Sequence, residues 1–397
     1  MQDPTPPATP PRSEAATEDA PQPRRGRWRW MRRLLVTSVI TLLLAEGGLR
    51  IVLFHPVGPI DDWASGLREA SLYAHPRTPL YWELRARLKP ANQRKPPLAP
   101  HDGLGWISPG QDPVTLSHPE VDQVADRHLV VLYGDSFAKC AGARERCWQH
   151  LLDESELGAT HAMLNYGVGG YGLDQSVMML ASTIEAHVEA KPLVLLGILV
   201  DDDLDRCALR IRGWPKPSFT PKGTDALQAH GASPMDIDEW IAAHPLPQTW
   251  WSWRLLVRES GLFTREDKEQ LDSIAEMEQS MRTVCARLLR RAKTETEFRG
   301  LELVVVLFHG QRLLELEDPT TNWREAFLRE HLTREGIPWV SSYTTLHADM
   351  RATGRELPQY FLAKGMGRGH YDAEGNEAVF PAILDAVAGR FDGPQGD

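Results

Sequence analysis

Ser136 stands where a serine could act as a nucleophile. It comes two residues after the glycine that ends the apolar run Leu129–Tyr133, and such a run is typical of a buried parallel strand. Open α/β sheets bind ligands just beyond the C-terminal ends of their strands. Acyl transfer needs a nucleophile, a base and hydrogen-bond donors aimed at the developing oxyanion, and Ser136 is our candidate for the nucleophile. The alternative is that its hydroxyl caps the N-terminus of a helix.

Three further segments lie at the ends of predicted strands or helices. The first, Asn165–Gln175, contains four glycines and follows a short apolar strand. The second is the acidic run Asp201–Asp203, directly after another apolar strand. The third, Gly369–Asn376, contains His370 and precedes an amphipathic C-terminal helix. All three are therefore candidates to join Ser136 at one edge of a sheet.

Together the four segments resemble the blocks of the SGNH (GDSL-type) hydrolases, in that family's order and approximate spacing. Gly134–Phe137 is similar to the first block, which carries the nucleophilic serine, and Gly369–Asn376 to the last, which carries the catalytic histidine. Asn165–Gln175 is similar to the glycine loop of the membrane-anchored bacterial branch. The resemblance spans roughly residues 129–391 and leaves their middle poorly covered.

The resemblance implies a role for each site residue. Ser136 would be the nucleophile, His370 the general base, and the backbone amides of Ser136 and Gly170 the oxyanion donors. Asp202 departs from the pattern, because the family has an asparagine there whose side-chain N–H binds the oxyanion. A carboxylate could donate only if protonated, which crowding by the two neighbouring aspartates would favour. A cation site on this acidic run is a further alternative, although acids at a strand end are usually solvated.

A second departure lies beside the predicted base. Gly367 and Arg368 occupy the places of the aspartate that normally precedes the family's histidine. Asp372 could replace it, or a backbone carbonyl could orient the His370 ring in a Ser–His dyad. His309, at the end of another predicted strand, is a secondary candidate on the ligand side. No cysteine spacing indicates a metal site, and we expect no cofactor.

The order of the elements predicts an α/β fold. Apolar runs alternate with helical periodicity, which implies a parallel sheet with right-handed crossovers. We expect a three-layer α/β/α, flavodoxin-like domain over residues 128–397, with a mainly parallel five-stranded sheet and the four site residues converging at its C-terminal edge. The expected strands are Leu129–Leu132, Ala162–Asn165, Leu193–Val200, Leu301–Phe308 and Trp339–Val340.

Residues 210–264 interrupt this alternation with a segment rich in proline and tryptophan, including Trp250, Trp251 and Trp253. We expect an insertion over the active site, in part as a lid or substrate wall. Its tryptophans are predicted to fill the core of a small subdomain. An aromatic platform for sugars is the alternative.

The N-terminal part predicts a membrane anchor. Residues 1–33 begin with a polar, proline-rich stretch and end in an arginine cluster, which indicates a disordered basic tail. Residues 34–54 are apolar and long enough to span a bilayer if Glu46 and Arg50 are included. Glu46–Arg50 also resembles the end of the anchor in the membrane-bound branch. A cleaved signal peptide and a peripheral amphipathic helix remain as alternatives. Residues 55–127 are expected to be a linker and lead-in of mostly irregular structure, with a short helix near Asp62–Leu72.

Charge and cysteine content restrict the compartment and the partners. Arginines on the N-terminal side of the anchor predict a single-pass inner-membrane protein with an extracytoplasmic, periplasmic domain. The net charge of −10 argues against general nucleic-acid binding. Export would allow disulfides. Cys140 and Cys207 should lie near the same sheet edge, a Cys140–Cys147 bond is equally conceivable, and Cys285 could be a plain buried thiol.

Two functions follow as hypotheses. The first is a membrane-anchored serine esterase or O-acyltransferase that acts on an acylated saccharide or lipid of the cell envelope. The second is a catalytically degenerate module of the same fold that binds carbohydrate or assists envelope assembly. The Ser136 and His370 segments favour the first, while Asp202 and Arg368 favour the second.

Overall fold

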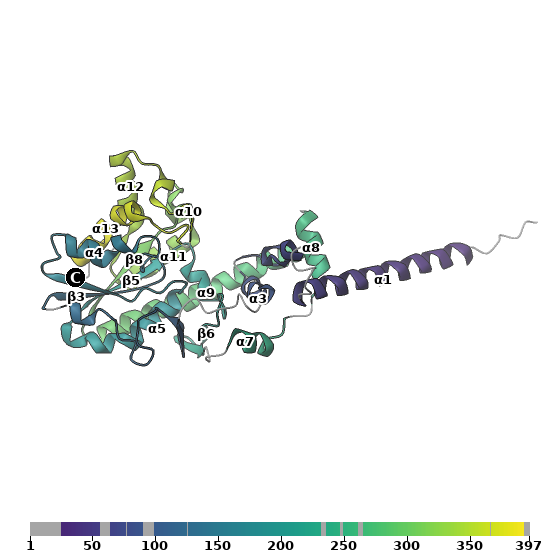
Figure 1. Cartoon of the computed structure of the whole chain (residues 1–397), viewed down its shortest axis with the longest axis horizontal. Coiled ribbons are helices and arrows are strands. Elements are labelled where there is room, and N and C mark those ends of the chain that lie inside the picture. The colour runs from purple at the N-terminus through teal and green to yellow at the C-terminus, as the bar shows by residue number, and fades with distance from the viewer. Residues whose placement is uncertain are drawn as a thin grey trace, which may run out of the picture.

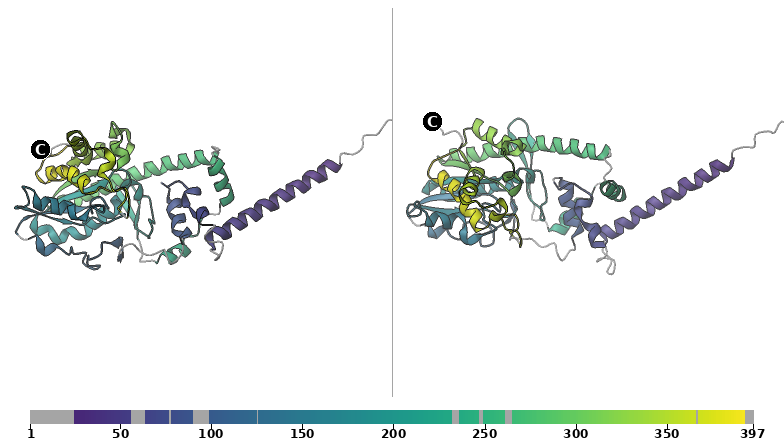
Figure 2. Two further views of the ribbon diagram at one scale, coloured as in Figure 1. Left: turned by 45° about the horizontal axis from the view of Figure 1, so that its top comes forward. Right: turned by 90° about the horizontal axis from the view of Figure 1, so that it is seen from above.

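The computed structural model of the chain (Figure 1) describes residues 25–55, 64–76, 78–89, 99–124, 126–231, 236–246, 249–260, 265–365 and 367–392. Most of them form an α/β domain, from which a long N-terminal helix projects (Figure 2). The first 24 residues of the predicted disordered tail lie outside the described residues. From Arg25 onward the rest of that tail is helical.

Five parallel strands form the central sheet, in the order β4-β3-β5-β8-β9. They are β3 (His128–Tyr133), β4 (His161–Asn165), β5 (Leu193–Leu199), β8 (Glu302–Phe308) and β9 (Trp339–Ser341). The predicted fold class is therefore confirmed. The strand order reverses between β3 and β5, which follow one another in the sheet but not in the chain. Such a reversal opens a crevice at the carboxyl ends of the two strands.

Helices cover both faces of the sheet. One face carries α5 (Leu173–Thr183), α9 (Arg265–Glu297) and α11 (Trp323–Arg334), and the other α4 (Trp148–Glu154), α12 (Ser342–Thr353) and α13 (Ala373–Val387). Alternate side chains of each strand enter the two cores: Val131 packs on the α5 side and Val130 on the α4 side. Because both sides of the strands are buried, their sequences are continuous apolar runs rather than alternating ones.

The lead-in contains more regular structure than predicted. Helix α3 (Pro79–Leu88) begins with a proline at its first position, where the missing N–H would have no intrahelical partner anyway. Strands β1 (Ala99–His101) and β2 (Gly105–Ile107) form a small antiparallel pair. For residues 79–88 the expectation of irregular structure was wrong. The many prolines of the segment indicated a break in helical structure, whereas Pro79 is the first residue of a helix.

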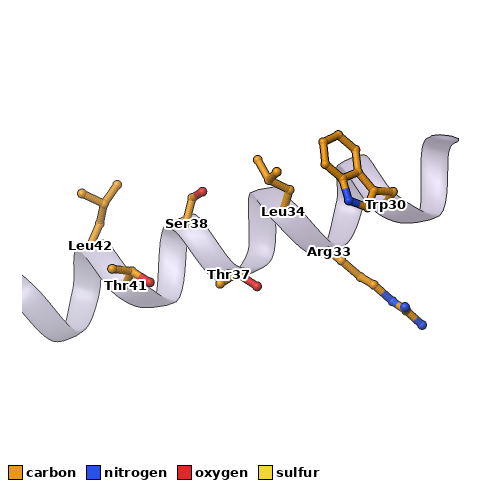
Figure 3. A pocket seen from close by; sticks show the side chains of 7 residues that line it. All are labelled: Trp30, Arg33, Leu34, Thr37, Ser38, Thr41 and Leu42. Carbon is orange, nitrogen blue, oxygen red and sulfur yellow. The ribbon is translucent and has the colours of Figure 1, made fainter.

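Helix α1 (Arg25–Phe54) is long and apolar enough over Trp28–Phe54 to cross a membrane, and its side chains from Trp28 to Ala45 are exposed. One N-terminal helix of this kind fits a signal anchor or a signal peptide. A shallow hollow on its first half includes the hydroxyls of Thr37, Ser38 and Thr41 (Figure 3). Such side chains suit an apolar helix because they can bond to the backbone one turn back.

The C-terminal end of α1 docks on helix α8 (Trp251–Ser260) of the insertion. The Glu46 carboxylate accepts hydrogen bonds from the backbone N–H groups of the first two residues of α8, at 3.1 and 2.9 Å, and from the Ser252 hydroxyl at 2.8 Å. Arg50 donates to Glu46 at 2.8 Å and to the carbonyl of Thr249 at 2.7 Å. Glu46 therefore caps the N-terminus of α8, and Arg50 holds Glu46 in place. The two charges that interrupt the apolar segment thus fix α1 to the rest of the chain.

Trp251 is buried beside Leu53 and Tyr73 in a small third core. The prediction that the insertion's tryptophans fill such a core is confirmed for this residue, whereas Trp250 and Trp253 are half exposed. This core joins the insertion to the lead-in and to the C-terminal end of α1 (Figure 1).

A disulfide joins Cys140 to Cys147, with Cα atoms 5.4 Å apart. It closes the loop between the segment of Ser136 and helix α4. Cys207 and Cys285 are buried free thiols. Of the two pairings considered from the sequence, the local one is therefore formed.

Candidate active site

Ser136 and His370 meet at the carboxyl end of β3. The Ser136 hydroxyl lies 2.8 Å from Nε2 of His370, although the residues are 234 positions apart in the chain. The turn between the strand and the serine requires a glycine at position 134. Any other residue would place its Cβ only 2.6 Å from the Ala138 side chain and 2.9 Å from the Gly197 carbonyl oxygen, which is too close. The loop is thus pressed against β5, and the alternative of Ser136 as a helix cap is not what the structure contains.

A backbone carbonyl orients the histidine ring. Nδ1 of His370 lies 3.0 Å from the carbonyl oxygen of Gly367. A carbonyl only accepts hydrogen bonds, so Nδ1 carries the ring proton and Nε2 has a free lone pair for the Ser136 hydroxyl. Asp372 caps helix α13 instead, accepting from the Gly375 amide at 2.8 Å. Of the two alternatives for the missing aspartate, the carbonyl is the one present.

The glycine loop lies directly against Ser136. An added Cβ at Gly169 would come within 4.0 Å of the Ser136 Cβ, and Gly170 adopts the left-handed conformation, with φ +86°. Among the described residues, no intramolecular acceptor pairs with the backbone N–H of Ser136 or of Gly170. The two backbone N–H groups that the sequence predicts as oxyanion donors are thus free of intramolecular acceptors among the described residues.

Asp202 does not lie free beside these donors. Its Oδ2 accepts from Arg206, at 2.9 and 2.7 Å, and from Nη2 of Arg212 at 2.9 Å. Nη1 of Arg212 donates to the carbonyl of Gly170 at 3.2 Å. The Asp202 carboxylate therefore forms ion pairs with two guanidinium groups.

The three acids of the run after β5 have separate partners. Asp201 accepts from the Gly310 amide at 2.6 Å, and Asp203 accepts from the Leu199 amide at 2.8 Å and from Arg206 at 2.6 Å. Burial raises the pKa of Asp201 and of Asp203. Among the described residues, no group of three or more His, Cys, Asp or Glu side chains could hold a metal ion. The acidic run therefore does not form a cation site.

Arg206 links the loops of the site. Its buried guanidinium donates to Asp135 at 2.9 Å and to the backbone of Tyr171, besides Asp202 and Asp203. Burial lowers and the three carboxylates raise the pKa of Arg206, with a net upward shift. The loop after β3, the glycine loop and the loop after β5 are thereby held together. Neither Arg206 nor Arg212 was predicted as a site residue.

His309 has a structural role rather than a place in the site. Its ring is fully buried, with Nδ1 2.9 Å from the Ser342 hydroxyl and Nε2 3.0 Å from Glu325. Both nitrogens are thus occupied by side chains from α11 and α12. The prediction that His309 faces the ligand side was wrong, because these helices close over the end of β8.

A cleft of about 1080 Å³ opens beside the Ser136–His370 pair. Phe137 and Gly369, the neighbours of the two residues in the chain, belong to its wall, together with Asp202 and Arg312. Trp82, on helix α3 of the lead-in, forms part of the opposite wall, and Arg212 stacks on its ring. The tryptophan of the cleft thus comes from the lead-in, and no described tryptophan of the insertion lines the cleft.

No family model and no curated protein sequence matches the chain. Solved structures that match include a member of the lipolytic G-D-S-L family from Veillonella parvula, at 13% identity and a TM-score of 0.35, covering 66% of this chain and 98% of that one. A catalytic mutant of an acetylxylan esterase from Geobacillus stearothermophilus matches at 12% identity and a TM-score of 0.36, covering 66% and 94%.

A two-domain esterase active on acetylated mannans also matches, at 12% identity and a TM-score of 0.36, covering 66% of this chain and 48% of that one. At such identities and TM-scores the likeness carries no statement about activity. What the chain shares with these proteins is a low-identity structural similarity to SGNH/GDSL lipolytic esterases.

Proposed function

We propose that this protein is a membrane-anchored serine esterase or O-acyltransferase of the SGNH type, with Ser136 as nucleophile and His370 as base. The observation that carries the proposal is the 2.8 Å contact between the Ser136 hydroxyl and Nε2 of a ring whose Nδ1 faces the Gly367 carbonyl. This is the geometry in which a histidine can take the serine proton as the hydroxyl attacks.

In the proposed reaction the Ser136 oxygen attacks the acyl carbonyl carbon while its proton passes to Nε2 of His370. The carbonyl electron pair becomes the oxyanion. When the intermediate collapses, the alkoxide leaving group departs with the proton from Nε2, and an acyl-serine remains. Water, or the hydroxyl of an acceptor, then gives its proton to Nε2 and attacks the acyl group to form a second tetrahedral intermediate. When this intermediate collapses, the bond between the acyl carbon and the Ser136 oxygen breaks, and that oxygen takes the proton back from Nε2. The acid or the new ester leaves, which completes hydrolysis or transfer.

The unpaired amides of Ser136 and Gly170 are the proposed oxyanion donors. The family's third donor, an asparagine side chain, is missing. Arg212 supplies a positive charge close to Gly170 in its place, held there by Asp202. A fixed cation near the developing charge stabilises the transition state without reorganisation during the reaction. Asp202 is thereby assigned to positioning Arg212 rather than to donating a hydrogen bond itself.

The cleft supports a substrate larger than a simple ester. At about 1080 Å³ it exceeds what a short acyl group fills, and its wall combines Trp82 with several charged side chains. The polar and charged side chains of this wall could hydrogen-bond to the hydroxyl groups of a sugar. We therefore propose an acylated saccharide as the substrate, with an acylated lipid of the cell envelope as the second choice, and no nucleic acid.

The apolar helix α1 and the arginines at its start support the proposed location in the inner membrane, with the domain on the periplasmic side. The test is protease treatment of intact spheroplasts, in which the domain should be digested while a cytoplasmic marker is protected. Protection of the domain would overturn the orientation.

The rival proposal, a degenerate binding module, draws on the aspartate at position 202 and on the lack of an acid beside His370. Hydrolysis of p-nitrophenyl acetate by the full chain in detergent separates the two. We expect saturable hydrolysis that falls by about 10³-fold or more in Ser136→Ala and in His370→Ala. Equal rates in the wild type and both variants would leave only the binding module.

A further inference from the structure

A second cavity lies behind the loop of Ser136, and the proposed reaction makes no use of it. Its volume is about 310 Å³, and it shares no lining residue with the cleft beside His370. Ser108 and Gln111 of the lead-in form one wall, and Lys139 and Arg144 of the disulfide loop form another. The space is large enough for a molecule the size of a monosaccharide.

Lys139 enters this cavity without a carboxylate partner. Its Nζ donates to the Ser108 hydroxyl at 2.9 Å, and no ion pair joins Lys139 or Arg144 to a carboxylate of the described residues. Burial, and then the charge of Arg144, lower the pKa of Lys139 to about 8. Two cations that lie in one lining with a single acid, Glu120, and make no ion pair with a described carboxylate give the cavity an excess of positive charge.

Gln111 provides an independent observation. Its side chain is only 8% exposed, and its Oε1 accepts from the Ser108 amide at 3.0 Å, which fixes the orientation of the amide group. Its buried Nε2 has no hydrogen-bond partner among the described residues. Buried polar groups without a partner are rare in folded proteins, so this donor indicates a ligand that accepts a hydrogen bond.

The histidines of the cavity do not supply further charge. His118 accepts from the Glu120 amide through Nδ1 and therefore donates through Nε2 to the Asn165 carbonyl, which makes it the neutral form. Burial lowers its pKa. His150 is exposed, with Nδ1 on the Arg144 carbonyl, and Glu120 is the one acid in the lining. Apart from the Glu120 carboxylate, the charged and unpaired groups left in the lining are the donors of Lys139, Gln111 and Arg144.

We propose that this cavity binds a small molecule through an oxyanion group, a sulfate, phosphate or carboxylate, held by Lys139, Gln111 and Arg144. Such a group offers only acceptors, which matches the three side chains. The site is distinct from the cleft, so the proposal does not rest on the proposed acyl chemistry.

Isothermal titration of the full chain in detergent tests the proposal, with sodium sulfate and sodium glucuronate as probes against sodium chloride at equal ionic strength. We expect saturable binding of at least one probe. Preference for sulfate would indicate a tetrahedral oxyanion, and preference for glucuronate a carboxylate sugar. Both anions keep their charge from about pH 6.5 to about pH 9.5, whereas Lys139 loses its proton across that range. Binding should therefore weaken at least five-fold as the pH rises past about 8.

Two variants locate the site. Lys139→Met and Gln111→Glu should each weaken binding ten-fold or more. Gln111→Glu keeps the size of the side chain and its hydrogen-bond acceptor, so it still tests the site if the lysine variant does not fold. Lys222→Met removes an exposed charge outside the cavity, on the hairpin of β6 (Ser218–Lys222) and β7 (Ala226–His230), and should leave binding unchanged. The proposal is overturned by the absence of saturable binding, or by an equal loss in Lys222→Met.

Discussion

The carboxylate of Asp202 and the guanidinium of Arg212 form an ion pair beside the glycine loop, with 2.9 Å between Oδ2 and Nη2. The same guanidinium donates to the Gly170 carbonyl at 3.2 Å. An aspartate at the place of the expected asparagine thus holds a positive charge next to a proposed oxyanion donor. The sequence alone suggested that this aspartate hampers catalysis, whereas the ion pair suggests that it contributes.

Asp202→Asn distinguishes these two interpretations. Because asparagine cannot hold two guanidinium groups as tightly, we expect kcat for p-nitrophenyl acetate to fall by about ten-fold. Asp225→Asn, at an exposed aspartate of the β6–β7 turn, serves as the control and should leave kcat unchanged. A ten-fold rise in Asp202→Asn would show instead that the amide restores a missing oxyanion donor.

The sheet and the meeting of Ser136 with His370 could be expected from the sequence for a physical reason. Strands buried on both faces are apolar runs that are easily recognised, and polar residues after parallel strands share one edge. The carbonyl of Gly367 could not be singled out, because every residue has one. Arg206 and Arg212 were missed because their partners come from loops up to 71 positions away, and no local pattern marks such a contact.

Helix α12 was also missed, and hairpin β6–β7 (Ser218–Lys222 and Ala226–His230) was hidden inside the insertion. Helix α12 follows β9 without a separating loop and begins where the Ser341 hydroxyl accepts from the Tyr343 amide. Its one fully buried apolar side chain is Leu346, too little for a visible helical period. Tertiary contact rather than sequence pattern defines this helix.

Buried His187 should make the protein less stable in acid. Burial, and then His118, lower its pKa below the unfolded value of about 6.5. The unfolded state thus binds the proton more readily, so stability is lost as the pH falls below about 6.5. His187→Gln, which can still bond to the Tyr166 hydroxyl, should lose less stability than the wild type between about pH 7.5 and about pH 5.5 in urea unfolding. An equal loss in both proteins would contradict this.

The Cys140–Cys147 disulfide should stabilise the loop that follows Ser136. Closing so short a loop is worth about 2–3 kcal/mol in the chain-entropy model. The double variant Cys140→Ser, Cys147→Ser should therefore lower the free energy of unfolding by about that amount. Cys207→Ser, at a buried free thiol, is the control: it shows how much the free energy of unfolding falls when a buried cysteine that forms no disulfide is replaced by serine. Insensitivity of the unfolding transition to reductant would argue against the bond.

Glu46 should matter for the junction between the anchor and the domain. Removing a helix cap costs about 1–2 kcal/mol, so Glu46→Ala should loosen α8 and expose the junction to protease. Limited proteolysis of the full chain in detergent should then cut near residue 249 faster than in the wild type. Glu69→Ala, outside this contact, should not change the cleavage rate. An unaltered digest of Glu46→Ala would mean that α8 is held by packing alone.

The most direct test of the central claim is to trap the acyl group. The full chain is incubated with p-nitrophenyl acetate, quenched in acid and digested, and the peptides are analysed by mass spectrometry. We predict an acetyl group on Ser136, which accumulates in the wild type and is absent in Ser136→Ala and strongly reduced in His370→Ala. An acetyl group on another residue with Ser136 unmodified, while the ester is being turned over, would contradict the account.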